Sequence, residues 1–241
     1  MERFPVSLKR REEVAAGTWA FTLGLEGQEL PFVPGQALDL FLVDPPHPDP
    51  RGPQHAFSIA GTAGPDAIQI ATRIRDSVWK KNLLEMPLGA KLEADGPWGE
   101  FTLPAKPGDI VLLAGGIGIT PFRAIAQDAT ARSLPHELSL IHSNRTPEET
   151  PFLAELRRWT TANHRFTYVP TMTQMERSHT PWVGMRGRID AALLDGVLDD
   201  HRNEAQYMVA GPGAFVAAVV AALGEVGIAP DRIASEDFPG Y

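Results

Sequence analysis

The sequence predicts an amino-terminal antiparallel β-barrel followed by a Rossmann-like α/β domain with a parallel sheet. Short β-like runs, closely punctuated by Gly and Pro, fill the chain up to residues 103–108, and strands alternate with helices after that point. A length of 241 residues suits two domains of ordinary size, and 43% hydrophobic residues are enough for buried cores. We place the domains at residues 1–105 and 106–241.

The first half contains six β-like runs and one helix-like stretch. Close spacing of turn residues between short strands is typical of a small antiparallel barrel. Ser77 begins the helix-like stretch and is a suitable N-cap, because its hydroxyl can accept a hydrogen bond from the first turn. The β-like runs cover residues 6–10, 19–25, 37–43, 56–60, 67–73 and 91–94, and the helix-like stretch covers 77–85.

The second half alternates strands with helices. This alternation predicts a parallel sheet with helices on both faces. We expect strands at 110–114, 137–142, 165–169 and 206–210, and helices at 121–132, 150–161 and 213–227.

Composition excludes several classes of function. A formal charge of −8 makes nucleic acid a poor partner, because phosphate backbones would be repelled. The sequence has no cysteine, which excludes thiolate catalysis and cysteine-ligated iron–sulfur clusters within these residues. Its seven histidines show no paired spacing, so we expect no metal. No apolar run has the length of a signal peptide or a membrane span, and we expect a soluble cytoplasmic protein with no membrane span.

A glycine-rich turn follows the first strand of the second half. Gly115, Gly116 and Gly118 precede Thr120, and Pro121 opens the helix. Glycines permit a tight turn and a close approach of backbone to a pyrophosphate, and the helix start offers free N–H groups to an anion. The strand–turn–helix context favours nucleotide binding over a purely structural turn.

The next strand ends without the carboxylate that usually holds the ribose hydroxyls of NAD. Ser143 and Arg145 occupy this place, and a guanidinium suits a phosphate. We therefore expect NADPH to be favoured, with NADH as the alternative. An Arg145 that is only a solvated loop residue remains the competing interpretation. Glu148 and Glu149 are interpreted as acids that favour the start of the following helix.

Four motifs in this order resemble the ferredoxin–NADP reductase family. They are His55-Ala56-Phe57-Ser58, the turn from Gly115 to Pro121, Ala210-Gly211-Pro212 and Glu236-Asp237-Phe238. The resemblance covers nearly the whole chain and implies a barrel that binds a flavin. Phe57 would pack on the flavin, and the Ser58 hydroxyl would bond its hydride-accepting nitrogen. The Phe57-Ser58 stretch and the helix start at Ser77 favour FAD, with its two phosphates, over FMN.

The resemblance also implies how the phosphates and the nicotinamide are held. His55 stands where the family has an arginine beside the flavin phosphates, so Arg51 or Arg73 would supply the missing charge, and Ser77 would begin the phosphate-binding helix. Gly211 and Pro212 would let the nicotinamide pass close to the backbone, with Ala210 in place of the family's frequent cysteine. Glu236 would orient the nicotinamide or relay a proton. Phe238 would cover the flavin, although Tyr241 is an alternative for that role.

The function that these features predict is an NAD(P)H-dependent flavoprotein reductase. It would take hydride from NAD(P)H onto FAD and pass electrons to a separate acceptor, such as ferredoxin, flavodoxin, an oxygenase component or free flavin. Two alternatives remain: a flavin-binding electron-transfer subunit of a larger complex, and a non-catalytic flavin- or nucleotide-binding regulatory module. The sequence does not identify the acceptor or the oligomeric state.

Overall fold

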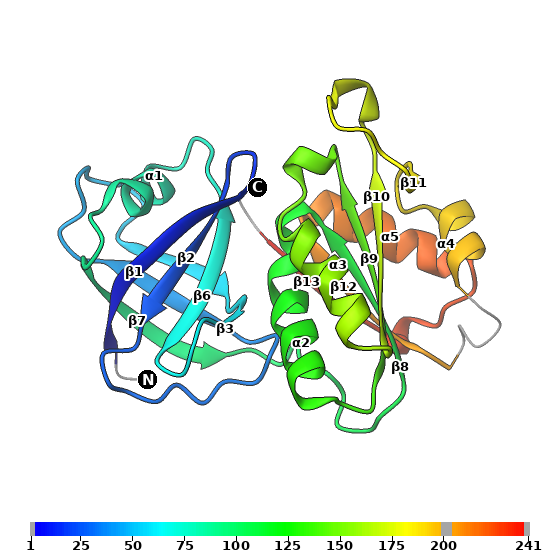
Figure 1. The fold of residues 1–241 in the computed structure, drawn as a ribbon, viewed down its shortest axis with the longest axis horizontal. Helices are drawn as coiled ribbons and strands as arrows, with labels where there is room; N and C mark the ends of the chain where they lie inside the picture. Colours follow the sequence, from blue (N-terminus) through cyan, green and yellow to red (C-terminus); the bar gives the residue numbers. More distant parts are fainter. Residues whose placement is uncertain (1–2, 199–203, 239–241) are drawn as a thin grey trace.

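Two sheets lie beside each other in a computed structural model that describes residues 3–198 and 204–238 (Figure 1). The first sheet is built from the amino-terminal half of the chain and the second from the rest. The strand that ends at Trp98 is the last of the first sheet, and the strand that starts at Asp109 is the first of the second. The predicted fold class is confirmed, while the boundary at residue 105 stays a prediction.

The first sheet is antiparallel and barrel-like. Its strand order is β4-β3-β7-β1-β2-β6-β5. Within the described residues β4 and β5 form its two edges, so the sheet curves without closing into a barrel. Its elements are β1 (Phe4–Ala15), β2 (Thr18–Gly24), β3 (Ala37–Leu42), β4 (Gln54–Ser58), β5 (Gly61–Thr62), β6 (Ala67–Arg73), helix α1 (Val78–Glu85) and β7 (Lys91–Trp98).

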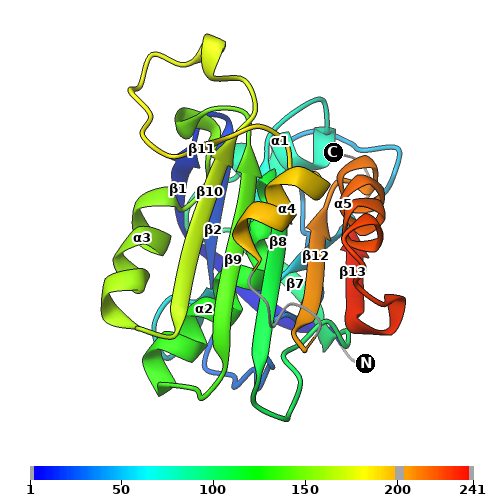
Figure 2. The same cartoon turned by 90° about the vertical axis from the view of Figure 1, so that its right-hand side faces the viewer.

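The second sheet is parallel, with the order β11-β10-β9-β8-β12-β13. Helices α2 and α3 lie on one face and α4 and α5 on the other (Figure 2). Its elements are β8 (Asp109–Gly115), α2 (Ile119–Arg132), β9 (Glu137–Asn144), α3 (Leu153–Ala162), β10 (Phe166–Met172), β11 (Met185–Arg186), α4 (Ala191–Val197), β12 (Gln206–Gly211), α5 (Gly213–Glu225) and β13 (Ile233–Asp237). Short 3-10 turns η1 to η4 cover Gly116–Gly118, Pro147–Glu149, Met175–Arg177 and Pro230–Arg232.

Most expected elements form close to their predicted positions, and the differences have local causes. The helix expected from residue 150 starts at Leu153, because Phe152 adopts a left-handed φ of 61° and interrupts the helical turn. The short strands β5 and β11 and the carboxy-terminal β13 were not expected. None of the helices within the described residues is long and apolar enough to cross a membrane.

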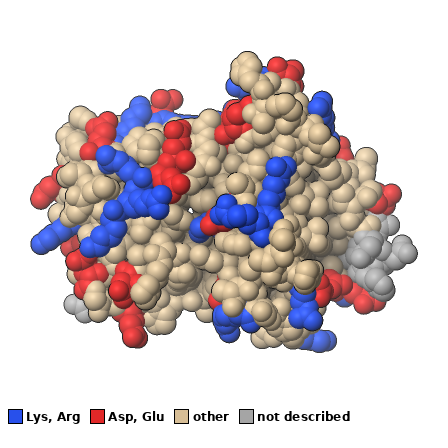
Figure 3. Space-filling view, viewed as in Figure 1, with Lys and Arg blue, Asp and Glu red and all other residues tan. Residues whose placement is uncertain are grey.

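Polar contacts hold the two halves together. Arg123 on α2 is buried, pairs with Glu155 through two N–O contacts of 2.7 and 2.9 Å, and donates to the Ala60 carbonyl of the first half at 2.6 Å. Gln127, one turn further along α2, exchanges two hydrogen bonds of 2.9 and 3.0 Å with the Thr62 backbone. On the face seen in Figure 3, acidic and basic side chains lie on both sides of the junction.

We expect Arg123→Ala to lower the free energy of unfolding by about 3 kcal/mol, because Glu155 and the Ala60 carbonyl would lose a buried partner. Chemical denaturation of the purified chain measures this. Arg132→Ala on the same helix is the matched control. Its arginine is exposed and, within the described residues, pairs with Asp128 alone at 3.2 Å, so a change within about 0.5 kcal/mol is expected. Equal effects of the two substitutions would contradict the role given to Arg123.

Candidate functional site

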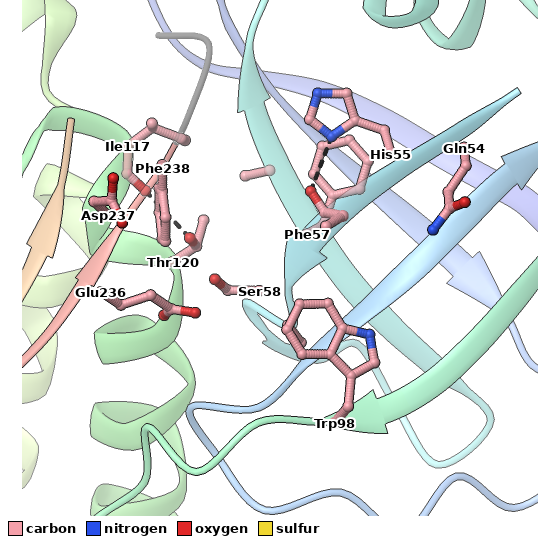
Figure 4. A pocket seen from close by; sticks show the side chains of 13 residues that line it. Gln54, His55, Phe57, Ser58, Trp98, Ile117, Thr120, Glu236, Asp237 and Phe238 are labelled. Carbon is pink, nitrogen blue, oxygen red and sulfur yellow. Dashed lines mark hydrogen bonds between the residues drawn. The ribbon is translucent and has the colours of Figure 1, made fainter. Parts of the chain in front are cut away.

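A cavity of about 440 Å³ lies between the two halves of the chain. Residues from six separate segments line it, and Figure 4 shows Ser58, Thr120, Glu236 and Phe238 around the same space. The amino-terminal half contributes Ala37, Gln54 to Ser58, Ala71 and Trp98, and the second half contributes Ile117, Thr120 and Glu236 to Phe238. The structure thus brings together His55, Phe57, Ser58, Thr120, Glu236 and Phe238, which are distant in the sequence.

Aromatic rings form much of the wall on the side of the first sheet. His55 stacks on Phe57 with ring centroids 4.7 Å apart, and Trp79 of α1 packs on both at 5.3 Å. Burial lowers the pKa of His55, and the nearby charges of Lys80 and Arg51 lower it further. His55 is therefore uncharged at neutral pH and does not replace the charge of an arginine. Trp98, which the sequence analysis did not single out as a site residue, lies at the end of β7 and is 37% exposed.

The opposite wall depends on β13, the carboxy-terminal strand. Its pairing with β12 sets Glu236 opposite Ala210, and the Phe238 N–H donates to the Gly211 carbonyl at 2.9 Å. These backbone bonds fix the segment against the sheet up to residue 238, while Tyr241 lies outside the described residues. Burial and the neighbouring Asp237 raise the pKa of Glu236. Its buried Oε2 has no hydrogen-bond partner among the described residues.

The glycine turn is shaped by two backbone requirements. Gly116 has a φ of +55°, and a Cβ there would meet no atom within 4 Å, so its backbone borders open space. A Cβ on Gly118 would lie 2.1 Å from the Ala210 carbonyl oxygen and 2.6 Å from the Gly211 Cα. The turn and the end of β12 therefore approach each other with no room for a side chain. This contact sets Thr120, in the first turn of α2, beside the cavity.

A buried histidine supports this turn. His142 on β9 is fully buried, and its Nε2 lies 2.9 Å from the Gly116 carbonyl oxygen while its Nδ1 lies 3.0 Å from the Tyr168 hydroxyl. A carbonyl can only accept, so Nε2 carries the proton and Nδ1 accepts from Tyr168. Burial lowers the pKa of His142 to about 4. The sequence analysis counted this histidine without assigning it a role, because its partners are 26 residues away on both sides.

A second cavity of about 310 Å³ lies at the other side of the glycine turn. Ser143, Arg145 and Glu149 line it together with Gly115, Gly116 and Pro212. The residues expected to bind the adenosine end and the pyrophosphate thus share one space. The backbones of Gly118 and Gly211 are in close contact at the same turn.

Arg73 and Ser77, which were also expected to hold the flavin phosphates, do not line the first cavity. Arg73 lines the second cavity, not the first, and its guanidinium pairs with Glu149. Ser77 lines neither cavity. Its hydroxyl accepts from the Lys80 N–H at 3.3 Å, so it caps α1. Lys80 is buried, and burial together with Arg75 and Arg51 lowers its pKa to about 8. Sequence reasoning missed this lysine, because a lysine on a short helix is ordinarily exposed.

The residues present fit a flavin and a nicotinamide nucleotide. The first cavity has an aromatic wall, buried hydroxyls of Ser58 and Thr120, and a buried carboxyl oxygen that lacks a partner. The glycine turn borders the second cavity with open backbone at a helix start, which suits a phosphate. No group of three or more metal-binding side chains occurs within residues 3–198 and 204–238.

Comparisons with known proteins agree with this geometry. Residues 112–221 match the family described as oxidoreductase NAD-binding domain. The glycine betaine monooxygenase reductase subunit of Chromohalobacter salexigens is 28% identical over 191 residues, which cover 76% of this chain and 48% of that protein. The chain thus spans about half the length of this relative.

Solved structures share the whole described fold. The Amycolatopsis cytochrome P450 reductase GcoB matches with a TM-score of 0.82 and 24% identity over 98% of this chain and 70% of that one. A ferredoxin NADP⁺ reductase from Neisseria gonorrhoeae with bound FAD and NADP matches with a TM-score of 0.79 and 22% identity over 98% and 99%. The fold that the resemblance to the ferredoxin–NADP reductase family implies is therefore confirmed.

The stability of the chain should fall between pH 6.5 and pH 5, in part because His142 is held neutral. The pKa of His142 is about 4 in the folded chain against 6.5 in the unfolded chain, so unfolding takes up a proton in this pH range. The stability that the neutral histidine contributes is therefore lost as the pH falls. The full contribution is about 3 kcal/mol. Denaturant unfolding at several pH values should show a shallower slope for His142→Gln. An unaltered slope in His142→Gln would contradict the assignment.

Proposed function

We propose that this chain, which has the ferredoxin–NADP reductase-like fold and an oxidoreductase NAD-binding domain, is a flavoprotein reductase that uses NAD(P)H and FAD. The observation that carries the proposal is the convergence in one interdomain cavity of Phe57, Ser58, Thr120, Glu236 and Phe238. A flavin bound here supplies the redox chemistry, by accepting hydride from NAD(P)H and releasing electrons to an acceptor.

The chain's own residues would bind and position the reactants. Ser58 is buried and lines the cavity, so its hydroxyl is held where a ligand can bond it. Phe57 and His55 present stacked rings, and Phe238 packs from the opposite side against the core of the second half. Two domains that close on one cavity exclude water and fix the distance between two bound molecules, which is the main protein contribution to hydride transfer.

Glu236 would hold or move a proton. Burial and Asp237 raise its pKa and so shift the carboxyl toward the protonated form, and its Oε2, which has no partner within the described residues, is available to a ligand. A carboxyl of this kind can donate to the amide of a nicotinamide or return a proton to a ligand after reduction. Backbone pairing of β13 with β12 keeps this carboxyl at the cavity.

Three cations would hold the flavin phosphates. Arg51 and Arg75 both lie close enough to Lys80 of α1 to lower its pKa, and Arg75 also lines the second cavity. Together they would replace the charge that His55 lacks at neutral pH. Three cations can balance the charge of two phosphates, which favours FAD over FMN. The start of α1 can also bind an anion, which favours FAD in the same way.

For the coenzyme, Ser143 and Arg145 support NADPH as the favoured donor, because both line the second cavity next to the glycine turn. A guanidinium there would pair with the 2′-phosphate. NADH remains the alternative. For the acceptor, the relative named as a monooxygenase reductase subunit and the neighbour named as a cytochrome P450 reductase support a separate oxygenase component. The relative named as a subunit equally favours the second candidate function, a flavin-binding electron-transfer subunit of a larger complex.

The purified protein should show a flavin absorption spectrum that bleaches under anaerobic conditions when NADPH or NADH is added. Heat should release FAD, identified by chromatography. Release of FMN would contradict the cofactor assignment. A colourless protein that FAD does not reconstitute would contradict the proposed function itself. Bound flavin without bleaching by either coenzyme would favour a regulatory module.

Ser58→Ala should slow reduction of the bound flavin by about 10²-fold or more, because one hydrogen bond to the reacting centre is lost. Flavin content should stay unchanged, since the aromatic wall remains. Stopped-flow absorbance after mixing with NADPH measures the rate. Thr161→Ala, which removes an exposed hydroxyl on α3, is the control and should react like the unaltered protein. A reduction rate in Ser58→Ala equal to this control would remove Ser58 from the mechanism.

A further inference from the structure

Glu149 lies among three arginines that come from three different segments. Its carboxylate pairs with Arg73 at the end of β6, lies 3.8 Å from the Arg145 guanidinium just after β9, and lies 4.0 Å from Arg177 in η3. The side chain of Glu149 is only 13% exposed. A carboxylate held in this way is a fixed feature of the site and not a mobile surface charge.

The same carboxylate lines the second cavity together with Ser143, Arg145 and the glycine turn. The end of β9 lacks an acid in the sequence, and this absence was the reason to expect NADPH. The structure supplies an acid to that place from four residues beyond Arg145, because η2 turns the chain back toward the strand end. A carboxylate beside a ribose can accept hydrogen bonds from a free 2′-hydroxyl.

The charges around Glu149 would act on a bound phosphate in opposite directions. Three guanidinium groups outnumber the one carboxylate, so the cluster attracts an anion. The carboxylate nevertheless repels a 2′-phosphate and occupies the guanidinium groups that would hold it. A phosphate that binds Arg145 must compete with Glu149 for this arginine, whereas a free hydroxyl need not.

We propose that Glu149 is a coenzyme-selecting residue that competes with the 2′-phosphate of NADPH for Arg145 and thereby limits the preference for NADPH over NADH. The proposal rests on the proposed function, because it takes the second cavity as the adenosine site. Arg145 attracts the 2′-phosphate, and Glu149 weakens this attraction. The two residues together determine how strongly the coenzymes are distinguished.

The neutral variant Glu149→Gln should keep the fold. The pair with Arg73 joins the two halves, but Arg123, Gln127 and a 2.8 Å bond from the Ala16 N–H to the Glu148 carbonyl join them independently. Arg73, Arg145 and Arg177 are also partly exposed, at 26%, 44% and 55%, so water can solvate them when the carboxylate is removed. Retained flavin and an unchanged melting profile would show that each variant is folded. If the glutamine variant does not fold, the affinities are measured with Glu149→Ala.

Titration calorimetry with 2′,5′-ADP and 5′-AMP tests the proposal, because these two ligands differ only in the 2′-phosphate. Glu149→Gln should raise the affinity for 2′,5′-ADP by about tenfold or more, as expected for a freed charge-assisted bond. The affinity for 5′-AMP should stay the same or fall. The gain should shrink as the salt concentration rises.

Two further variants make the result specific. Arg145→Ala should weaken the binding of 2′,5′-ADP much more than the binding of 5′-AMP. In the double variant Arg145→Ala/Glu149→Gln, most of the affinity gained by Glu149→Gln should disappear, because this gain acts through Arg145. Glu176→Gln changes the net charge equally in the exposed segment next to Arg177 and should alter neither affinity.

The outcomes separate this proposal from the proposed function. If both ligands bind and Glu149→Gln leaves their affinity ratio unchanged, the role of Glu149 is refuted while the adenosine site stands. A ratio that changes equally in Glu176→Gln would refute it as well, since the effect would then be one of net charge. If neither ligand binds the unaltered protein, the adenosine site and the role of Glu149 fall together.

Discussion

The close backbone contact between the glycine turn and the end of β12 is the constraint on which the site depends. A Cβ on Gly118 would lie 2.1 Å from the Ala210 oxygen, so the two parallel strand ends meet without an intervening side chain. That contact sets the direction in which α2 leaves the sheet, and it brings Thr120 to the cavity. Since β13 pairs with β12, the same contact brings Glu236 to the cavity that Thr120 lines. His142 then fixes the Gly116 carbonyl from inside the sheet.

Directed polar bonds join the two halves alongside apolar packing, in which Ala20 and Ala71 of the first half lie in the hydrophobic cluster of the second. Arg123 and Gln127 bond backbone groups of the first half, and Glu149 pairs with Arg73. Such bonds require defined directions, so they fix one relative placement of the halves more strictly than apolar packing would. This matters because the first cavity takes one wall from each half. A small displacement of either half would change the separation between the aromatic wall and Glu236.

Local sequence patterns were sufficient to predict the strand, turn and helix that contain Gly115 to Pro121, and to predict Ser77 as a helix cap. The meeting of Ser58, Thr120, Glu236 and Phe238 followed from the order of motifs and not from any local pattern. Sequence reasoning failed where the partner is distant. Glu149 looked like an acid that favours a helix start, because Arg73 lies 76 residues before it. Lys80 looked like a surface residue, since burial of its side chain results from tertiary packing.

Glu148 and Glu149 are adjacent acids whose side chains serve different neighbours. The Glu148 carboxylate accepts hydrogen bonds from Ser178 and from the His179 and Thr180 N–H groups, and bonds from Thr180 and Ser178 help to lower its pKa. Glu149 points to the arginines of the second cavity. An insertion of one residue between Arg145 and Glu148 would move Glu148 to the place of Glu149 and leave the contacts of Glu148 unmade. The connection between β9 and α3 is therefore constrained in length as well as in composition.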